Sequence, residues 1–518
     1  MATSLNSYIG NKGYTIPKKS LSIEQEKRIR DELMIKPKVN GPTGLGQKSS
    51  FPAYRESNNK FYVPHYYGIE NFGKPSKVEI SSGDNINIAF NGELRDYQKP
   101  VVKTYLEHVS KSEVGGGLLE LPCAWGKTII ALNIIEKLKK KTFIIVHKEF
   151  LMNQWIERIE QFLPTAKIGK IQGQIVDIDG KDIVIGMLQS LSMKEYPLHL
   201  FDSFGFTIID EVHHISSEVF SNTLFKLVTK YMLGLSATME RKDGTTDVFK
   251  MFLGKVVFKG NRDEEHKVEV RSIEYKTNDA EFNEIKYDFR GNPMYSTMIS
   301  KLCEYNRRSE FILKVLTDML NESDCKQIMI LAHNKNLLKY LYDAISHRNL
   351  ATVGYYLGGM KEKALKESES KKVVIATYAM AAEALDIKTL TTLIMATPKT
   401  DIEQSVGRIL RDRHSKPIVV DIIDSHDIFK NQWRKRKTFY RRENYKIIYT
   451  NSDRYESETK NWDLLFSPSV KKPPHKECKP KKNTSNKSNS STDKSITSDS
   501  EEEDDTTKNG ICLLQFKK

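Results

Sequence analysis

The chain has 518 residues, of which 39% are hydrophobic and 29% are charged. This length and composition exclude a wholly disordered or fibrous protein and predict about three domains with packed cores. The formal net charge of +14 favours a phosphate-rich partner such as nucleic acid, although an AT-rich genome that overuses lysine codons would produce the same excess.

Cysteines and apolar runs set further limits. The five cysteines are scattered without C-x-x-C spacing, which argues against a disulfide framework or a zinc site and suits a reducing compartment. No secretory signal opens the chain, and no apolar run approaches the ~18 residues that a membrane-spanning helix needs. We expect a soluble intracellular protein.

The N-terminal part divides into two segments by composition. Residues 1–50 are polar with scattered Gly and Pro, and we expect a loosely ordered arm with a helical piece at residues 23–34. Residues 51–92 hold short aromatic and β-branched runs broken by Gly, Asn and Pro. This pattern predicts a small β-rich module, with the runs at residues 60–69, 78–80 and 86–90 as its strands.

From residue 93 onward, buried-strand runs alternate with amphipathic helices, which predicts βαβ units and parallel sheets. The first unit covers residues 93–304, with predicted strands at residues 118–121, 143–147, 183–187 and 206–210. The second unit covers residues 305–466, with predicted strands at residues 328–332, 353–357, 372–377, 392–397 and 418–423. The expected fold class is α/β, with two tandem parallel-sheet lobes.

The C-terminal tail, residues 467–518, is rich in Lys, Ser, Asn and Thr and then acidic. Such a composition cannot bury enough apolar surface to offset the entropy of ordering, so we expect disorder. The final ICLLQFKK fits an ordinary terminus better than a docking motif.

A candidate phosphate-binding loop lies at residues 121–128, which read LPCAWGKT. The pattern G-x-x-x-x-G-K-[ST] has glycine where this chain has Leu121. The predicted strand before the loop and the predicted helix after it nevertheless direct backbone N–H groups and a helix N-terminus at a bound phosphate. Gly126 allows close approach, Lys127 reaches the β- and γ-phosphates, and Thr128 holds Mg²⁺. We predict that ATP contacts Leu121, Pro122, Cys123, Ala124, Trp125, Gly126, Lys127 and Thr128.

A second candidate motif, FTIIDEVHH, places two acids at the carboxyl end of a buried strand, where ligands gather in open α/β sheets. We predict that Asp210 holds Mg²⁺ and that Glu211 orients or deprotonates the attacking water. The alternative is an acidic strand end followed by a solvated loop.

A third candidate motif is QSVGRILR. On a helix, Gln404, Arg408 and Arg411 share one face because they are spaced four and three residues apart. Arginines that face a γ-phosphate neutralise transition-state charge, worth ~10³–10⁵ in rate in other NTPases. Here they come from the second lobe, so hydrolysis would depend on closure of the two lobes.

Six motifs in order over roughly residues 92–450 resemble those of the superfamily 2 helicases and translocases, which have two RecA-like lobes with ATP in the cleft between them. ELRDYQ resembles the adenine-sensing motif, with Gln98 as the base reader, and LPCAWGKT resembles motif I. DEVHH resembles motif II, and TYAMAAEALDI resembles motif V, with Thr377 near the nucleic-acid backbone and Asp386 near ATP. QSVGRILR resembles motif VI. The motif II box is Asp210, Glu211, Val212 and His213, and the SAT triplet of motif III, which implies coupling, is Ser236, Ala237 and Thr238.

Within the superfamily, the L-P-C loop, DEVHH and the SAT-x-x-R-x-D run resemble the XPB/UvsW branch, which includes poxvirus-type transcript-release helicases. Two positions depart from that branch. Arg241-Lys242-Asp243 has a base where XPB-like members have the middle acid of R-E-D, and Ala384 replaces the glycine of motif V. The first departure weakens the analogy to XPB's repair role, and the second bears on a backbone contact to nucleic acid.

Nucleic-acid contacts of such a motor fall on phosphates rather than bases. The candidates follow predicted strand ends: Lys148, Gln189 and Thr377. His147 fits a core or loop position equally well. In WRKRKTFYRRENYK, the aromatic residues Trp433, Phe439 and Tyr440 fit a helix packed on the second lobe better than a base-stacking surface.

The resemblance implies an ATP hydrolase with ATP and Mg²⁺ as cofactors, acting as a motor on nucleic acid, with DNA favoured. An RNA helicase is the alternative within the class, because these motifs do not report the 2′-OH. A scaffold of a transcription complex that uses ATP only as a latch is the alternative of another class. The branch also implies a large DNA virus, transcription machinery as a partner, and host cytoplasm or virion as location.

Overall fold

The computed structural model describes residues 6–38, 50–122, 125–197, 199–215, 217–239, 241, 243–260, 268–322, 325, 327–383, 387, 389–407 and 417–468. The expectation of a disordered tail therefore falls almost wholly outside the described residues. No helix in the described ranges is both long enough and apolar enough to span a bilayer.

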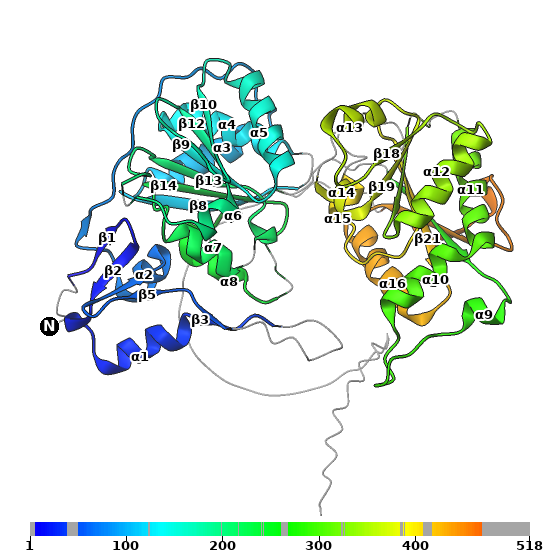
Figure 1. The fold of residues 1–518 in the computed structure, drawn as a ribbon, viewed down its shortest axis with the longest axis horizontal. Coiled ribbons are helices and arrows are strands. Elements are labelled where there is room, and N and C mark those ends of the chain that lie inside the picture. Colours follow the sequence, from blue (N-terminus) through cyan, green and yellow to red (C-terminus); the bar gives the residue numbers. More distant parts are fainter. Residues whose placement is uncertain are drawn as a thin grey trace, which may run out of the picture. The chain divides into compact units, whose positions relative to one another are not determined.

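The N-terminal module is one five-stranded sheet of order β5-β6-β2-β1-β7 (Figure 1, blue). Its strands are β1 (Tyr8–Gly10), β2 (Gly13–Pro17), β5 (Arg55–Glu56), β6 (Lys60–Val63) and β7 (Lys77–Val78). A small second sheet pairs β3 (Met34–Ile35) with β4 (Phe51–Pro52). The module also contains the 3-10 turn η1 (Lys18–Ser20) and helices α1 (Ile23–Glu32) and α2 (His65–Phe72).

The expected boundary at residue 50 is wrong, because it cuts through this sheet. β2 pairs antiparallel with β6, and Tyr14, Ile16 and Phe61 from the two sides of the boundary are fully buried together. The helical piece in the first segment is confirmed as α1, which begins with a capping box between Ser22 and Gln25.

Two of the strands expected in residues 51–92 also differ from the structure. The run at residues 60–69 is a strand only to Val63, and α2 follows directly. The run at residues 86–90 does not pair in the module's sheet, since Ile86 and Ile88 are buried in the core of the next domain. The N-terminal segment thus passes into the first lobe before residue 92.

Lobe 1 is an eight-stranded sheet of order β11-β10-β12-β9-β13-β14-β8-β15, in which all neighbours are parallel except β11 and β10. Helices α3, α4 and α5 pack on one face, and α6, α7 and α8 on the other (Figure 1). The strands are β8 (Gly115–Glu120), β9 (Thr142–Val146), β10 (Ile168–Gln172), β11 (Ile175–Asp177), β12 (Ile183–Met187), β13 (Phe206–Ile209), β14 (Tyr231–Ser236) and β15 (Val256–Lys259). The helices are α3 (Lys99–Val109), α4 (Lys127–Leu138), α5 (Glu149–Phe162), α6 (Leu188–Met193), α7 (Ser217–Leu224) and α8 (Thr246–Leu253), with the 3-10 turn η2 (Val212–His214).

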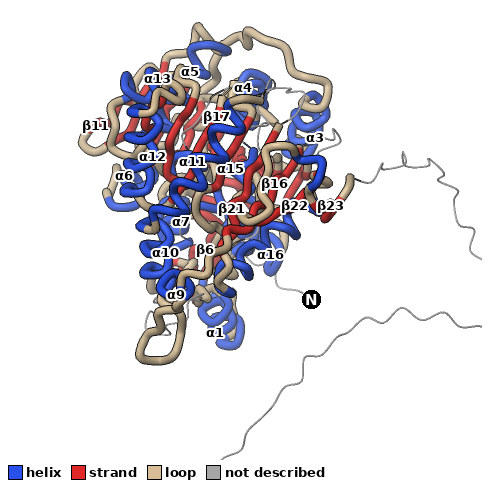
Figure 2. Tube along the Cα trace, turned by 90° about the vertical axis from the view of Figure 1, so that its right-hand side faces the viewer, coloured by secondary structure: helices blue, strands red, loops and turns tan. Residues whose placement is uncertain are grey.

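Lobe 2 is a second eight-stranded sheet, of order β18-β19-β17-β20-β21-β16-β22-β23, with only β23 antiparallel to its neighbour. Figure 2 shows its strands side by side beneath α11 and α12. The strands are β16 (Glu269–Tyr275), β17 (Ile328–Ala332), β18 (Val353–Tyr356), β19 (Val373–Thr377), β20 (Thr392–Met395), β21 (Ile418–Asp424), β22 (Lys446–Asn451) and β23 (Asp463–Phe466).

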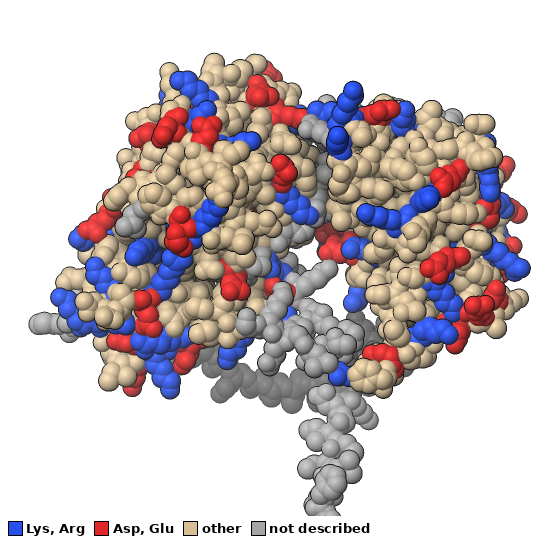
Figure 3. Space-filling model, viewed as in Figure 1, with Lys and Arg blue, Asp and Glu red and all other residues tan. Residues whose placement is uncertain are grey.

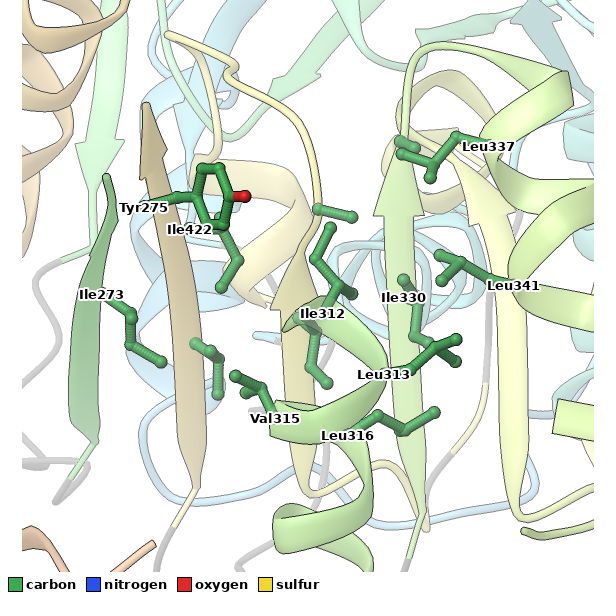
Figure 4. Packing of buried hydrophobic residues seen from close by; sticks show 14 of the residues in the cluster. Ile273, Tyr275, Ile312, Leu313, Val315, Leu316, Ile330, Leu337, Leu341 and Ile422 are labelled. Atoms are coloured by element: carbon green, nitrogen blue, oxygen red, sulfur yellow. The ribbon is translucent and has the colours of Figure 1, made fainter. Parts of the chain in front are cut away.

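The helices of lobe 2 cover both faces of the sheet. Ile312 and Leu316 of α11 pack against Ile330 of β17 and Ile422 of β21 (Figure 4). The helices are α9 (Ala280–Asn283), α10 (Tyr295–Glu304), α11 (Asn306–Leu320), α12 (Lys335–His347), α13 (Glu362–Glu369), α14 (Tyr378–Glu383), α15 (Glu403–Gly407) and α16 (Asp427–Arg442), with the 3-10 turn η4 (Thr459–Asn461).

The expected lobe boundary at residues 304–305 is also wrong. β16 lies between β21 and β22 in the second sheet, and α10 packs in the same core, so lobe 2 begins before Glu269. Lobe 1 ends with β15, whose last residue is Lys259. The two-lobe α/β architecture itself is confirmed.

Candidate active site at the strand ends of lobe 1

The phosphate loop connects β8 to α4, as the sequence predicts. Gly126 has the left-handed conformation (φ 73°) and α4 begins at Lys127. A Cβ at Gly126 would lie 2.6 Å from the side-chain nitrogen of Gln98. Glycine suits the left-handed backbone here, and a side chain would displace the Gln98 amide.

Leu121 stands where a phosphate loop usually has its first glycine, and the structure gives a reason. Its side chain is fully buried in the core of lobe 1, and its N–H donates to the carbonyl of Ser236 at 2.8 Å. The residue therefore extends β8 beside β14 instead of forming part of the turn.

Gln98 is buried against the loop, with only 4% of its surface exposed. Its Nε2 donates to the carbonyl of Trp125 at 2.8 Å, and its Oε1 accepts from the N–H of Arg95 at 3.0 Å. The Trp125 ring also packs on Tyr97, with centroids 5.0 Å apart. The predicted adenine reader thus lies next to the loop and fixes its backbone.

Lys127 and Glu211 form the central ion pair of the site, with 2.5 Å between Nζ and Oε1. Lys127 comes from the first turn of α4, and Glu211 follows β13. Both side chains are mostly buried, with 14% and 20% exposed, so their attraction is screened less than at an open surface. The structure therefore joins the loop to the acidic motif as the sequence predicts.

Asp210 lies beside this pair at the end of β13. Its carboxylate accepts from the indole N–H of Trp155 at 2.9 Å and from the N–H of Glu211 at 3.0 Å. Burial raises the pKa of Asp210 to about 6, and the neighbouring charge of Glu211 adds to the rise while Lys127 opposes it. A buried carboxylate supplies the oxygen ligands that Mg²⁺ prefers, and Thr128, the second predicted ligand, follows Lys127 in the first turn of α4.

The backbone at Glu211 is strained. Its φ of 49° and ψ of 52° lie in the left-handed region, which costs a non-glycine residue roughly 1–2 kcal/mol. Such strain concentrates at functional sites, where surrounding contacts hold it. Here the conformation turns the side chain back toward Lys127 immediately before η2.

Motif II and motif III meet at His213 and Ser236. Nδ1 of His213 lies 2.6 Å from Oγ of Ser236, and that hydroxyl donates to the carbonyl of Thr238 at 2.5 Å. Since the single hydroxyl proton goes to Thr238, Nδ1 of His213 carries the proton of the first bond. Nδ1 is also 3.4 Å from Glu211 Oε2. The predicted coupling triplet Ser236–Thr238, with Ala237 buried at its centre, therefore connects to Glu211 through His213.

Arg241 is a structural residue of the site whose role sequence reasoning missed. Its guanidinium donates to the carbonyls of His213 (2.7 Å) and Ile215 (2.5 Å) and to both carboxylate oxygens of Asp243 (3.0 and 2.6 Å). The bond from Arg241 holds the pKa of Asp243 well below its usual range. The R-x-D spacing was noted only as a mark of the branch, because contacts to backbone carbonyls leave no residue pattern.

The same cluster reaches the N-terminal module. The carbonyl of Asp243 accepts from the N–H of Lys38 at 2.9 Å, three residues after β3. Arg241 thus holds the backbone of the segment that follows Glu211, and Asp243 connects this cluster to the N-terminal module.

Several predicted residues lie outside the described residues: Cys123, Ala124, Lys242, Ala384, Asp386, Arg408 and Arg411. Gln404 lies in α15, but its side chain is also outside them. The structure therefore brings together motifs I, II and III with Gln98, whereas the arginine helix stays a prediction.

The predicted nucleic-acid residues lie at or just after the carboxyl ends of strands. Lys148 precedes α5 after β9, Gln189 is exposed in α6 after β12, and Thr377 ends β19. Because β9 and β12 are parallel neighbours, Lys148 and Gln189 lie at one edge of the lobe 1 sheet. Their contact with nucleic acid stays a prediction.

Helix α16 packs its aromatic residues on lobe 2, as the sequence favoured. Tyr440 is fully buried and its hydroxyl donates to Asp421 at 3.0 Å. Trp433 is half-buried and lines a cavity of about 250 Å³. On the face shown in Figure 3, basic and acidic side chains are interspersed rather than gathered by sign.

The chain is similar to several known proteins. The family model described as Type III restriction enzyme, res subunit, matches residues 91–241. A mimivirus (Acanthamoeba polyphaga mimivirus) protein that bears the name ATP-dependent RNA helicase L396 is 35% identical over 458 residues, which cover 86% of this chain and 87% of the relative.

Two further relatives are more distant. An African swine fever virus protein that bears the name ATP-dependent RNA helicase QP509L is 26% identical over 401 residues, covering 72% of this chain and 78% of the relative. DNA 3'-5' translocase XPB2 of Sulfurisphaera tokodaii is 32% identical over 226 residues, covering 43% of this chain and 48% of the relative. Together with the motif order and the two-lobe fold, the extent of the mimivirus match shows that the chain belongs to the superfamily 2, ATP-dependent helicases of large DNA viruses.

Proposed function

We propose that lobe 1 carries the ATP-hydrolysis site of a Mg²⁺-dependent motor that moves along DNA. The observation that carries the proposal is the Lys127–Glu211 ion pair beside the buried Asp210. This arrangement brings three groups together at the carboxyl ends of the strands: a cation at a helix N-terminus, a base and a buried carboxylate. Phosphoryl transfer to water requires such a set.

The residues divide the chemistry between them. Lys127 releases Glu211 when its ammonium turns to the β- and γ-phosphates of bound ATP, and Glu211 then accepts a proton from the attacking water or orients it. Asp210 and Thr128 would hold Mg²⁺, which would neutralise phosphate charge. His213 transmits a change at Glu211 to Ser236 and Thr238. Arg408 and Arg411 complete the site from lobe 2 when the lobes close on ATP.

DNA is the proposed substrate because the translocase XPB2, which is similar over 43% of this chain, is named for DNA. RNA is the second candidate because the mimivirus and African swine fever virus relatives bear names of RNA helicases over a larger share of this chain. The resemblance to transcript-release helicases further suggests transcription machinery as a partner. We expect the 2′-OH to be distinguished outside the shared motifs.

The test is the rate of ATP hydrolysis without nucleic acid and with ssDNA, dsDNA, ssRNA or dsRNA, each at two salt concentrations. Stimulation by DNA alone supports the proposed motor, and stimulation by RNA alone moves the protein to the second candidate. Zero turnover with every nucleic acid would instead favour an ATP-latched scaffold. Full stimulated turnover by an Arg411→Ala protein would contradict the role given to the arginine helix.

A further inference from the structure

A short hairpin in lobe 2 projects between α9 and α10. We call residues 286–294 the aromatic pin. Tyr287 and Pro293 form an antiparallel bridge, the N–H of Met294 donates to the carbonyl of Lys286 at 2.8 Å, and the N–H of Asp288 donates to the carbonyl of Asn292 at 2.8 Å. The segment is therefore closed by its own backbone.

Asp288 fixes the turn at the tip of the aromatic pin. Its Oδ1 accepts from the N–H groups of Arg290 and Asn292, both at 2.9 Å, and these bonds hold the pKa of Asp288 below its ordinary value, that from Asn292 most strongly. Gly291 supplies the left-handed conformation (φ 79°) that closes the turn. The tip is pre-organised without support from a hydrophobic core.

This rigid turn displays an aromatic ring to solvent. Phe289 is 90% exposed, more than any other large apolar side chain in the described part of the chain, and Tyr287 in the same turn is 55% exposed. The guanidinium of Arg290 lies 5.0 Å from the centroid of the Phe289 ring. A phenylalanine held in the open by ordered backbone bonds gains free energy when another molecule covers its ring.

We propose that the aromatic pin stacks Phe289 on an unpaired base of the nucleic acid on which the motor acts, with Arg290 at the adjoining phosphate. This inference rests on the proposed function and adds a contact outside the six motifs. Stacking suits a motor because every base has a π-face, so the contact is strong without being sequence-specific.

The form of the aromatic pin favours a base over a protein surface. One ring at the tip of a narrow turn cannot provide the ~800 Å² per partner that a stable protein–protein interface buries. The Arg290 guanidinium lies over the Phe289 ring, so an aromatic face for a base and a cation for the neighbouring phosphate occur together at the tip.

The experiment compares the full chain with Phe289→Ala, Phe289→Leu and Phe289→Trp. The probe is a single-stranded DNA with one 2-aminopurine, and the RNA of the same sequence, since stacking on a ring changes the 2-aminopurine fluorescence. Leu464→Ala is the matched control, because Leu464 is another exposed apolar residue of lobe 2 (59%). ATP hydrolysis is measured on the same samples, with and without the probe.

We expect Phe289→Ala and Phe289→Leu to lose the fluorescence change and to weaken strand binding about tenfold, within the range of one base–aromatic stack. Phe289→Trp and Leu464→Ala retain both, and hydrolysis without nucleic acid is unchanged in all variants. The proposal is overturned if Phe289→Ala binds the strand as the wild type does, or if Phe289→Leu restores binding, since leucine keeps apolarity but not the π-face.

The two hypotheses fail differently. If the wild type hydrolyses ATP faster with the strand but Phe289→Ala does so equally, only the aromatic pin is wrong. If the wild type does not bind the strand but hydrolyses ATP faster with a duplex, again only the aromatic pin is wrong. If the wild type responds to none of the four nucleic acids, the proposed function is wrong and the aromatic pin with it.

Discussion

Both lobes bury carboxylates on a central parallel strand, but the partners of those carboxylates differ. In lobe 2, Asp424 receives two bonds from Arg308 (2.6 and 2.8 Å) and Asp421 two from Arg436 (both 2.8 Å), with all four side chains at most 1% exposed. In lobe 1, the described residues give Asp210 a tryptophan N–H and a backbone N–H. A fully paired buried acid has a structural role, whereas Asp210 is the carboxylate that we propose as a ligand of Mg²⁺.

This difference could not be read from residue patterns. TIID in lobe 1 and VDIID in lobe 2 are both apolar strands that carry aspartate. The arginines that neutralise the lobe 2 acids come from α11 and α16, and Arg308 is more than a hundred residues from Asp424 in the chain. A buried aspartate can be assigned a structural or a functional role only when its partners are known.

The largest effect that the comparison predicts is on turnover at lobe 1. Lys127→Ala should lower ATP hydrolysis at least about a hundredfold, the scale for losing one donor to transition-state charge. Steady-state hydrolysis at saturating ATP measures it, with the exposed Lys103→Ala of α3 as control. Normal turnover by Lys127→Ala would remove the site assignment altogether.

Arg308→Ala should act on stability instead. Removing one partner of a buried ion pair leaves Asp424 charged and unpaired, which costs ~3–5 kcal/mol of unfolding free energy. Hydrogen–deuterium exchange should show lobe 2 peptides losing protection. A well-packed apolar double variant, Arg308→Met with Asp424→Leu, should recover most of the lost stability. If it does not, the ion pair contributes more to stability than mutual neutralisation of the two charges.

Smaller effects are expected when a neutral donor to each kind of aspartate is removed. Tyr440→Phe removes one donor from Asp421, which retains both bonds to Arg436, so we expect a loss of roughly 1–2 kcal/mol in stability and unchanged ATP hydrolysis. Trp155→Phe removes the donor to Asp210 and should lower turnover about tenfold, equivalent to ~1.4 kcal/mol. Measuring unfolding and hydrolysis for both variants tests this, and equal effects on hydrolysis would erase the distinction between the two kinds of acid.

Strands buried on both faces were predictable because they are continuous apolar runs. All of β9 and β17 are buried, and their sequences, TFIIV and IMILA, indicate this directly. β16 was not predictable, because EVRSIEY is fully buried while carrying Glu269, Arg271 and Glu274. Arg271 pairs with Glu269 and Glu322, and Lys430 pairs with Glu274, and such pairing allows a charged strand to be a central one. The lobe boundary was misplaced for this reason.

The N-terminal strands were missed for a different reason. β1 and β2 have only 3 and 5 residues, and β2 pairs with β6 across the segment that contains α1, so no local periodicity marks them. In the site, Lys127, Asp210 and Glu211 were predictable because side-chain chemistry defines their motifs. The roles of Leu121 and Arg241 depend on contacts to backbone carbonyls, which any suitably placed residue can make.

Glu211 is proposed to act on water at a site built by Lys127 and Asp210. ATP binding and turnover by Glu211→Gln test this, because the variant keeps the size of the side chain but removes the base. We expect ATP binding within a few-fold of the wild type and turnover reduced about a hundredfold or more, the lower range of a general-base contribution. Turnover close to that of the wild type would contradict it.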